Sequence, residues 1–234
     1  PTKIKKQTLN DMKAMILAAG EGTRLQPLTL KIPKPLLKVG SSSLIEDQIN
    51  KLLNLGINDF VINISYLGEQ IKESLKNHSH HQNICFIEEP YPYGTGGALV
   101  NAIDHLGDDP FILCNADIFS EIDLSKLPSS TDAAHLIGIS NPNHNQDGDF
   151  SLLGSSVIIN EKANDLTWSG ISLINPIILK EYLNLDFPFD IWNTIMRPLI
   201  KAQKITAHQD TSLWIDIGTI ERLELARASL KEEN

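Results

Sequence analysis

Short apolar runs alternate with amphipathic helical segments along the first half of this chain, and the alternation limits the folds that it can adopt. Four runs suit buried strands, at residues 14–17, 60–64, 84–87 and 111–114. Between the first two runs, apolar side chains recur with the period of a helix. Buried strands connected by helices form parallel sheets with helices on both faces. The pattern therefore predicts an α/β fold with a mostly parallel, Rossmann-like sheet.

The second half of the chain is less regular, and we expect it to form a small subdomain. Strand-like segments lie at residues 133–139, 156–160, 168–174 and 214–216, and helix-like segments at 176–183, 190–202 and 219–230. We expect Phe187, Phe189 and Trp192 to pack against these helices. The predicted organisation is a disordered tail at 1–11 and one domain at 12–234, whose two halves meet near residue 130.

Composition and charge exclude several classes of protein. The 234 residues are 41% hydrophobic and 21% charged, which is typical of globular proteins. The net charge of −9 disfavours nucleic acid and anionic membrane as partners. No apolar run reaches the ~18–20 residues that cross a bilayer, and no signal peptide is recognisable. We expect a cytoplasmic protein, a monomer or small homo-oligomer, with Cys85 and Cys114 buried and unpaired.

A glycine-rich loop of sequence LAAGEGTRL ends the first predicted strand. Small residues let a ligand approach the backbone there, and Gly20 and Gly22 allow successive N–H groups to face an anion. Arg24 adds a planar fork for phosphate oxygens, and Lys34, held between two prolines, adds a point charge. Residues 22–45 hold four basic and no acidic side chains. The segment indicates a phosphate site, and a solvated basic turn is the alternative.

Two aspartates each come at the end of a short apolar strand. Asp117 follows residues 111–114, and Asp216 lies in the run WIDIGT. Mg²⁺ prefers one or two carboxylates together with substrate oxygens and water. Asp117 and Asp216 are therefore candidate Mg²⁺ ligands, although Asp216 could instead cap the last helix.

Several motifs together resemble the sugar-1-phosphate nucleotidyltransferases. The run LAAGEGTRL, followed by PLT at 27–29 and PKPL at 33–36, is similar to the signature of that family. Further similarities are YGTGGAL at 93–99, NAD at 115–117, WSGI at 168–171 and WIDIGT at 214–219. The resemblance spans nearly the whole chain. It implies a glycosyltransferase-A-like fold with a nucleotide half at 12–130 and a sugar-binding half at 131–234.

The resemblance implies a reaction in which a nucleoside triphosphate and a sugar 1-phosphate give a nucleotide sugar and pyrophosphate, with Mg²⁺ as cofactor. The implied catalytic residues are Arg24, Lys34, Asp117 and Asp216, and both aspartates bind the metal. The implied nucleotide-binding residues are Leu17, Ala18, Ala19, Gly20, Gly22, Thr23, Arg24, Lys34, Thr95 and Gly96. The implied sugar-binding residues are Asn115, Asp149 and Gly170. For Asp149, a role in forming its polar loop is an equally good interpretation.

The attacking phosphate oxygen is already anionic at neutral pH, so the reaction needs no general base. Catalysis then consists of positioning and charge stabilisation. Among the short members of the family, the chain most resembles those that use UTP with an amino-sugar 1-phosphate in cell-wall recycling. Members that use GTP with mannose 1-phosphate are the alternative. A protein that binds nucleotide sugars without turnover is a third possibility, which the presence of all four charged residues disfavours.

Overall fold

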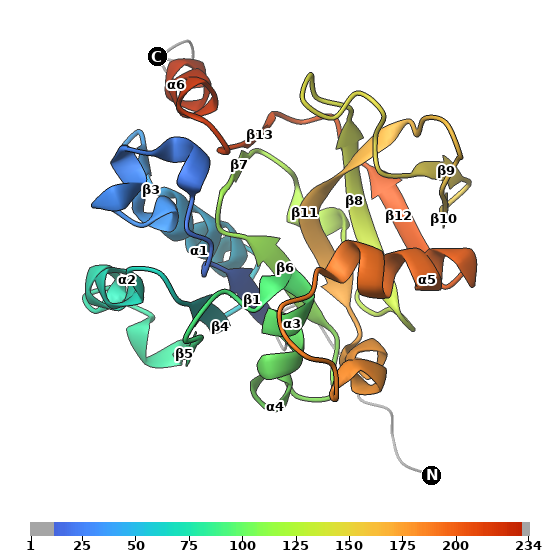
Figure 1. Cartoon of the computed structure of the whole chain (residues 1–234), viewed down its shortest axis with the longest axis horizontal. Helices are drawn as coiled ribbons and strands as arrows, with labels where there is room; N and C mark the ends of the chain where they lie inside the picture. Colours follow the sequence, from blue (N-terminus) through green and yellow to red (C-terminus); the bar gives the residue numbers. More distant parts are fainter. Residues whose placement is uncertain (1–11, 231–234) are drawn as a thin grey trace.

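The computed structural model describes residues 12–230, so the tail expected at 1–11 lies outside the described residues. Within the described part, one sheet of nine strands crosses the molecule in the order β5-β4-β1-β6-β11-β8-β12-β10-β9 (Figure 1). Its first four strands are β1 Lys13–Leu17, β4 Asp59–Ile64, β5 Ile84–Glu88 and β6 Phe111–Asn115. They pair in parallel, as the four apolar runs predict.

Five further strands extend the sheet through the second half of the chain. They are β8 Ala134–Ser140, β9 Ser151–Leu153, β10 Ser156–Ile158, β11 Leu166–Ile174 and β12 Ile205–Gln209. β11 lies between β6 and β8 and is antiparallel to both, whereas β12 is parallel to β8. At the edge, β10 is antiparallel to β12 and to β9. Of these nine strands only β10 and β11 oppose the others, so the sheet is mostly parallel, as expected.

Helices cover both faces of the sheet, which confirms the predicted layers (Figure 1). They are α1 Leu44–Asn54, α2 Gly68–Leu75, α3 Gly94–Asn101, α4 Ile103–Leu106 and α5 Arg197–Lys201. Ala14 and Ile16 of β1 pack in the cluster of α1 and α2, and Met15 packs in the cluster of α3, α4 and α5. The division arises because successive side chains of a strand point to opposite faces. No helix within residues 12–230 has the length and apolar character that crossing a bilayer requires.

Smaller elements lie beside the sheet, and some of them build a third apolar cluster. They are the strand pairs β2 Lys38–Val39 with β3 Ser42–Ser43 and β7 Ile118–Ser120 with β13 Trp214–Asp216, the helix α6 Ile220–Ser229, and the 3-10 turns η2 Thr23–Leu25, η3 Leu28–Leu30, η4 Lys34–Leu36, η5 His81–Asn83 and η6 Leu124–Lys126. Leu25, Leu44 and Leu223 are fully buried in this cluster. It fixes the segment that carries Arg24 and Lys34 against the last helix of the described chain.

Two helices expected in the second half take other forms. The segment expected at 176–183 is the 3-10 helix η7 Pro176–Tyr182, and the segment expected at 190–202 begins as the π-helix η8 Trp192–Met196 before α5. Such short helices depend on tertiary packing more than on periodicity.

Phe187, Phe189 and Trp192 pack against the apolar cluster that includes side chains of the second-half helices, as expected. The two phenylalanines also contact the first half of the chain. The Phe187 ring stacks on Tyr93 at 4.3 Å between centroids, and the Phe189 carbonyl accepts hydrogen bonds from Gly96 and Gly97. A Cβ on Gly96 would lie 2.5 Å from the Phe189 ring. Both phenylalanines therefore also hold the start of α3, in the first half of the chain.

The two cysteines are free, but only one is fully buried. Burial raises the pKa of the Cys114 thiol to about 12. Cys85 is only partly buried and lies 3.3 Å from Nδ1 of His105. The expectation of burial was wrong for Cys85 because β5 is an edge strand of the sheet.

A pair of histidines between β8 and β12 predicts sensitivity to acid. His135 Nε2 lies 2.8 Å from His208 Nδ1, and burial, together with the neighbouring His208, lowers the pKa of His135 to about 4. Burial also lowers the pKa of His208. Below pH 6.5 the unfolded chain binds protons that the folded chain does not, so the free energy of unfolding should fall as the pH drops from 6.5 towards 4. We expect a loss of about 1–2 kcal/mol, discounted because both rings are partly solvated.

Urea unfolding at pH 7 and pH 5 measures this loss. The substitution His135→Asn removes the ring and should shrink the difference between the two pH values. His80→Ala, in the turn that follows α2, should leave the difference unchanged. An equal pH dependence in His135→Asn and the unsubstituted protein would show that other groups cause the acid sensitivity.

Candidate active site

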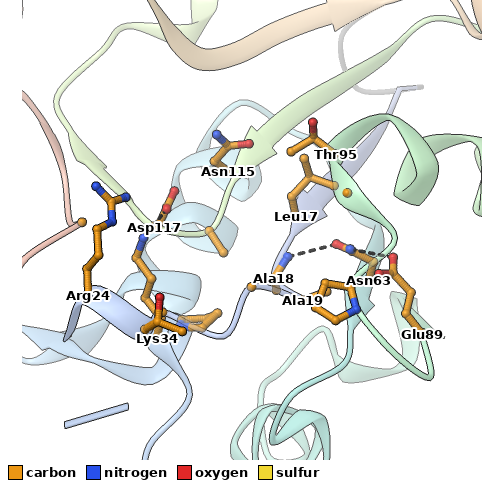
Figure 2. Close-up of a pocket in the computed structure, with 18 residues that line it drawn as sticks. Leu17, Ala18, Ala19, Arg24, Lys34, Asn63, Glu89, Thr95, Asn115 and Asp117 are labelled. Carbon is orange, nitrogen blue, oxygen red and sulfur yellow. Dashed lines mark hydrogen bonds and ion pairs between the residues drawn. The ribbon is translucent and has the colours of Figure 1, made fainter. Parts of the chain in front are cut away.

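A pocket of about 310 Å³ lies at the carboxyl ends of β1, β4 and β6 (Figure 2). Ligands of open α/β sheets bind at this edge. Nine of the ten expected nucleotide-binding residues line it: Leu17, Ala18, Ala19, Gly20, Gly22, Thr23, Arg24, Lys34 and Thr95. Gly96 does not line the pocket, because it is buried beneath Phe189. The glycine-rich loop and the start of α3 therefore face each other across one cavity.

Gly22 determines how the glycine-rich loop folds over Lys34. Its φ of 63° is in the left-handed region, and its carbonyl accepts a hydrogen bond from Thr29 Oγ1 at 2.8 Å. A Cβ on Gly22 would lie 3.0 Å from the Thr29 methyl group and 3.2 Å from the Lys34 Cβ. Only glycine adopts this positive φ without strain and also leaves room for the Thr29 and Lys34 side chains. By contrast, a Cβ on Gly20 would meet no atom within 4 Å, so that side of the loop is open.

Asp117 and Asp216 both lie near the same ammonium group. Lys34 Nζ donates to Asp117 Oδ2 and lies 4.0 Å from Asp216 Oδ1. The pairing of β7 with β13 brings the two aspartates together, because Asp216 is in register with Ile118 and the Ile217 N–H donates to the Asp117 carbonyl at 2.9 Å. Two strand ends that are distant in the sequence thus form one carboxylate pair.

The carboxylate pair fits a divalent metal whose other ligands come from substrate. Within residues 12–230 no group of three or more His, Cys, Asp or Glu residues could hold a metal alone. Asp117 and Asp216 nevertheless converge on one positive charge, and Mg²⁺ commonly takes only one or two protein carboxylates beside phosphate oxygens and water. Both aspartates are partly exposed, with 30% and 21% of their side-chain surfaces accessible.

Arg24 is the cation of the site whose charge is available to a ligand. Its side chain is exposed and lines the pocket opposite the Asn63 side (Figure 2). Among the residues that the structure describes, none forms an ion pair with it. Lys34, in contrast, is 8% exposed and already bound to Asp117. The two cations therefore differ: one is free to bind a polyphosphate, and the other is fixed between carboxylates.

A second pocket of about 470 Å³ adjoins the first and shares Arg24, Asn115 and Asp117 with it. All three expected sugar-binding residues line this second pocket: Asn115, Asp149 and Gly170. Gly170 has a φ of 78°, and a Cβ there would lie 2.6 Å from Asn115 Nδ2. The buried Asn115 Oδ1 has no hydrogen-bond partner among the described residues. An acceptor left open in this way is suited to a polar ligand.

Asp149 connects the loop at 141–150 to β11. Its Oδ2 accepts a hydrogen bond from the Trp168 N–H at 2.8 Å, and its Oδ1 accepts one from Asn145 Nδ2 at 3.1 Å. These two hydrogen bonds fit the loop-forming role of Asp149, which the sequence alone did not distinguish from sugar binding. The carboxylate still lines the second pocket, so the sugar-binding role stays a prediction.

Two polar residues of the first pocket were missed by sequence reasoning. Asn63 Oδ1 accepts from the Ala18 N–H at 3.0 Å, and Asn63 Nδ2 donates to Glu89 Oε1 at 2.8 Å (Figure 2). Glu89 Oε2 accepts from the Tyr93 N–H at 2.8 Å, and burial raises the pKa of this carboxyl. The chain of bonds joins the glycine-rich loop to the start of α3. The available signal was Asn63 itself, a polar residue within an apolar strand.

The chain is similar to known proteins in sequence and in structure. A family model described as "Nucleotidyl transferase" matches residues 13–141, which is more than half of the chain. An N-acetylmuramate alpha-1-phosphate uridylyltransferase of Neisseria meningitidis is 37% identical over 228 residues, which cover 93% of this chain and 97% of that protein. A mannose-1-phosphate guanyltransferase of Saccharomyces cerevisiae is 42% identical over 120 residues, which cover 50% of this chain and 33% of that protein. The crystal structure of HddC from Yersinia pseudotuberculosis, complexed with GMP-PN, shares the fold with a TM-score of 0.77 over 94% of this chain and 99% of that one, at 24% identity.

Proposed function

The chain belongs to the nucleotidyl transferase family, and from this premise we propose that it transfers the uridylyl group of UTP to N-acetylmuramate 1-phosphate. The products are UDP-N-acetylmuramate and pyrophosphate. The observation that carries this proposal is the 37% identity to the Neisseria uridylyltransferase over nearly the full length of both chains. The yeast guanyltransferase matches only half of this chain, so GTP with mannose 1-phosphate is the second candidate.

The two adjoining pockets suit the two substrates. We place UTP in the first pocket, between the glycine-rich loop and Thr95, and the sugar in the second, beside Asn115, Asp149 and Gly170. The pockets meet at Arg24, Asn115 and Asp117, where the two phosphates react. An oxygen of the sugar phosphate attacks the α-phosphorus of UTP, and the bond from that phosphorus to the bridging oxygen breaks. Both electrons of that bond leave with pyrophosphate.

The charged residues hold the reacting phosphates in this proposal. Arg24, which has no ion-pair partner among the described residues, binds the triphosphate and the leaving pyrophosphate. Lys34 binds oxygens near the reacting phosphorus. Asp117 and Asp216 hold Mg²⁺, which supplies neutralisation of the phosphate charges when bound. Since no proton has to be removed from the attacking phosphate, positioning and electrostatics account for the catalysis.

The product suggests a role in peptidoglycan recycling. UDP-N-acetylmuramate is a nucleotide-activated cell-wall sugar, and UTP is available in the cytoplasm. We therefore place the enzyme there.

A pyrophosphate-release assay tests the function. The protein is incubated with Mg²⁺, each of the four common nucleoside triphosphates in turn, and a panel of sugar 1-phosphates. N-Acetylglucosamine 1-phosphate is the matched control, since it lacks only the lactyl ether of N-acetylmuramate 1-phosphate. We expect release with UTP and N-acetylmuramate 1-phosphate. Release with GTP and mannose 1-phosphate instead would establish the second candidate, and no release with any pair would favour a binding protein without turnover.

A further inference from the structure

His144, Arg222 and Asp216 form a cluster on the wall of the second pocket. Arg222 Nη1 lies 2.9 Å from His144 Nε2 and 3.0 Å from Asp216 Oδ2. The side chain of His144 is 41% exposed and lines the pocket, whereas that of Arg222 is 16% exposed and does not line it. Arg222 therefore lies behind the two residues that face the ligand space and contacts both.

The contact with Arg222 determines which nitrogen of His144 carries the proton. A guanidinium has only donors, so His144 Nε2 must accept the hydrogen bond. A neutral imidazole that accepts at Nε2 carries its hydrogen on Nδ1. No residue among 12–230 is a hydrogen-bond partner of this Nδ1. The His144 ring, stacked near Trp214 with an angle of 17° between planes, thus offers an unused N–H donor at the pocket.

Arg24 makes this wall suited to an anion. A Cβ on Gly218 would lie 1.9 Å from Arg222 Nη2 and 3.2 Å from Arg24 Nη2, so the two guanidinium groups converge over one backbone position. Like charges this close repel unless an anion lies between or beside them. Asp216 pairs with Arg222, while Arg24 has no ion-pair partner among the described residues. The unused N–H of His144 and the unpaired charge of Arg24 therefore belong to the same pocket.

We propose that His144 Nδ1 donates a hydrogen bond to the 1-phosphate of the sugar substrate, and that Arg222 is the positioning residue that fixes this tautomer while holding Asp216. The inference rests on the proposed function. The phosphate is the group assigned to this donor because His144 lies 3.8 Å from Asp216 and shares its pocket with Arg24 and Asp117, where the phosphates of the two substrates meet. A contact with the lactyl carboxylate of N-acetylmuramate is the competing assignment.

Steady-state kinetics of His144→Ala test the phosphate contact. We expect the KM for the sugar 1-phosphate to rise about 10-fold to 100-fold, as for loss of a hydrogen bond to a charged group, and the KM for UTP to stay within about 2-fold. His144→Gln keeps an acceptor for Arg222 and a donor for the phosphate, so it should recover part of the loss. His80→Ala, in the turn that follows α2 and outside both pockets, is the matched control and should behave as the unsubstituted protein.

A double-mutant cycle tests whether Arg222 acts through His144. We expect Arg222→Ala to raise the KM for the sugar 1-phosphate as much as His144→Ala does, and the double variant to show no further rise. Arg222→Ala should also lower kcat, since it releases Asp216. KM effects that multiply in the double variant, or a KM for UTP that rises equally, would overturn the assignment. Melting temperatures of all variants identify any that fail to fold.

Calorimetric titration in EDTA provides a readout that needs neither metal nor turnover. Inorganic phosphate and N-acetylmuramate 1-phosphate are titrated into the unsubstituted protein and His144→Ala. Weaker binding of both ligands to the variant supports the phosphate contact, and weaker binding of the sugar phosphate alone assigns His144 to the lactyl carboxylate instead. If the pyrophosphate assay identifies another sugar 1-phosphate, the proposed function fails, and the same titration with that substrate still decides the role of His144.

Discussion

Replacing Asp117 with asparagine should lower kcat on the order of 1000-fold, equivalent to about 4 kcal/mol of transition-state stabilisation. The substitution keeps the size of the side chain and removes its charge. Asp117 lines both pockets, as Arg24 and Asn115 do, and it bonds to Lys34. Loss of its charge weakens the proposed metal site at the point where we propose that the phosphates react. It also leaves the buried Lys34 ammonium with only Asp216, at 4.0 Å.

Kinetics at increasing Mg²⁺ concentration measure this effect. The Mg²⁺ concentration for half-maximal rate should rise together with the fall in kcat. Asp109→Asn is the matched control, because Asp109 is exposed and lines neither pocket. A kcat in Asp117→Asn that equals that of the control would remove Asp117 from the catalytic machinery, whatever the role of Asp216.

The first half of the fold could be predicted because its signals are local. The strands β1, β4, β5 and β6 are apolar runs, and α1 combines helical periodicity with a capping box in which Ser43 and Glu46 bond reciprocally. The strands β9 and β12 carried no such signal, since β9 has three residues and β12 reads ITAHQ. Their pairing depends on neighbours that are distant in the sequence, which short-range patterns do not contain.

The same distinction applies to the site. Gly22, Arg24 and Lys34 are close in the sequence, so their motif could be recognised from letters alone. The bond from Asn63 to Glu89 spans 26 positions, and that from Arg222 to His144 spans 78. Neither pair has a spacing that indicates contact. Such partners become visible only when the sheet and the strand pair β7–β13 bring their segments together.

Lys34→Ala should separate metal binding from catalysis, because the two effects are expected in opposite directions. In the folded protein the Lys34 ammonium bonds to Asp117 and lies near Asp216, so it competes with a cation for the same carboxylates. Its removal leaves Asp117 without its cationic partner and Asp216 with Arg222, so the pair of carboxylates becomes more attractive to a cation. We therefore expect the variant to bind Mg²⁺ more tightly than the unsubstituted protein, by about 10-fold in the absence of substrate.

The same substitution should lower kcat about 100-fold to 1000-fold, comparable to the loss of one preorganised donor at a reacting oxyanion. Lys34→Arg should not restore the rate. The Lys34 side chain is 10% exposed and runs beneath Gly22, where an added Cβ would lie only 3.2 Å from the Lys34 Cβ. The broader guanidinium does not fit that space without moving the glycine-rich loop.

Calorimetry with Mg²⁺ and steady-state kinetics on the same preparations test both directions together. Lys38→Ala is the matched control, since Lys38 is an exposed lysine of the same basic segment and lines neither pocket. Weaker Mg²⁺ binding in Lys34→Ala would mean that the lysine supports the carboxylate pair rather than competing for it. Full activity in Lys34→Arg would show that charge alone suffices. If Lys34 binds the substrate phosphates during the reaction, its removal should tighten Mg²⁺ binding and slow turnover. The two effects are expected together only in that case, because the same side chain then competes with the metal and assists the reaction.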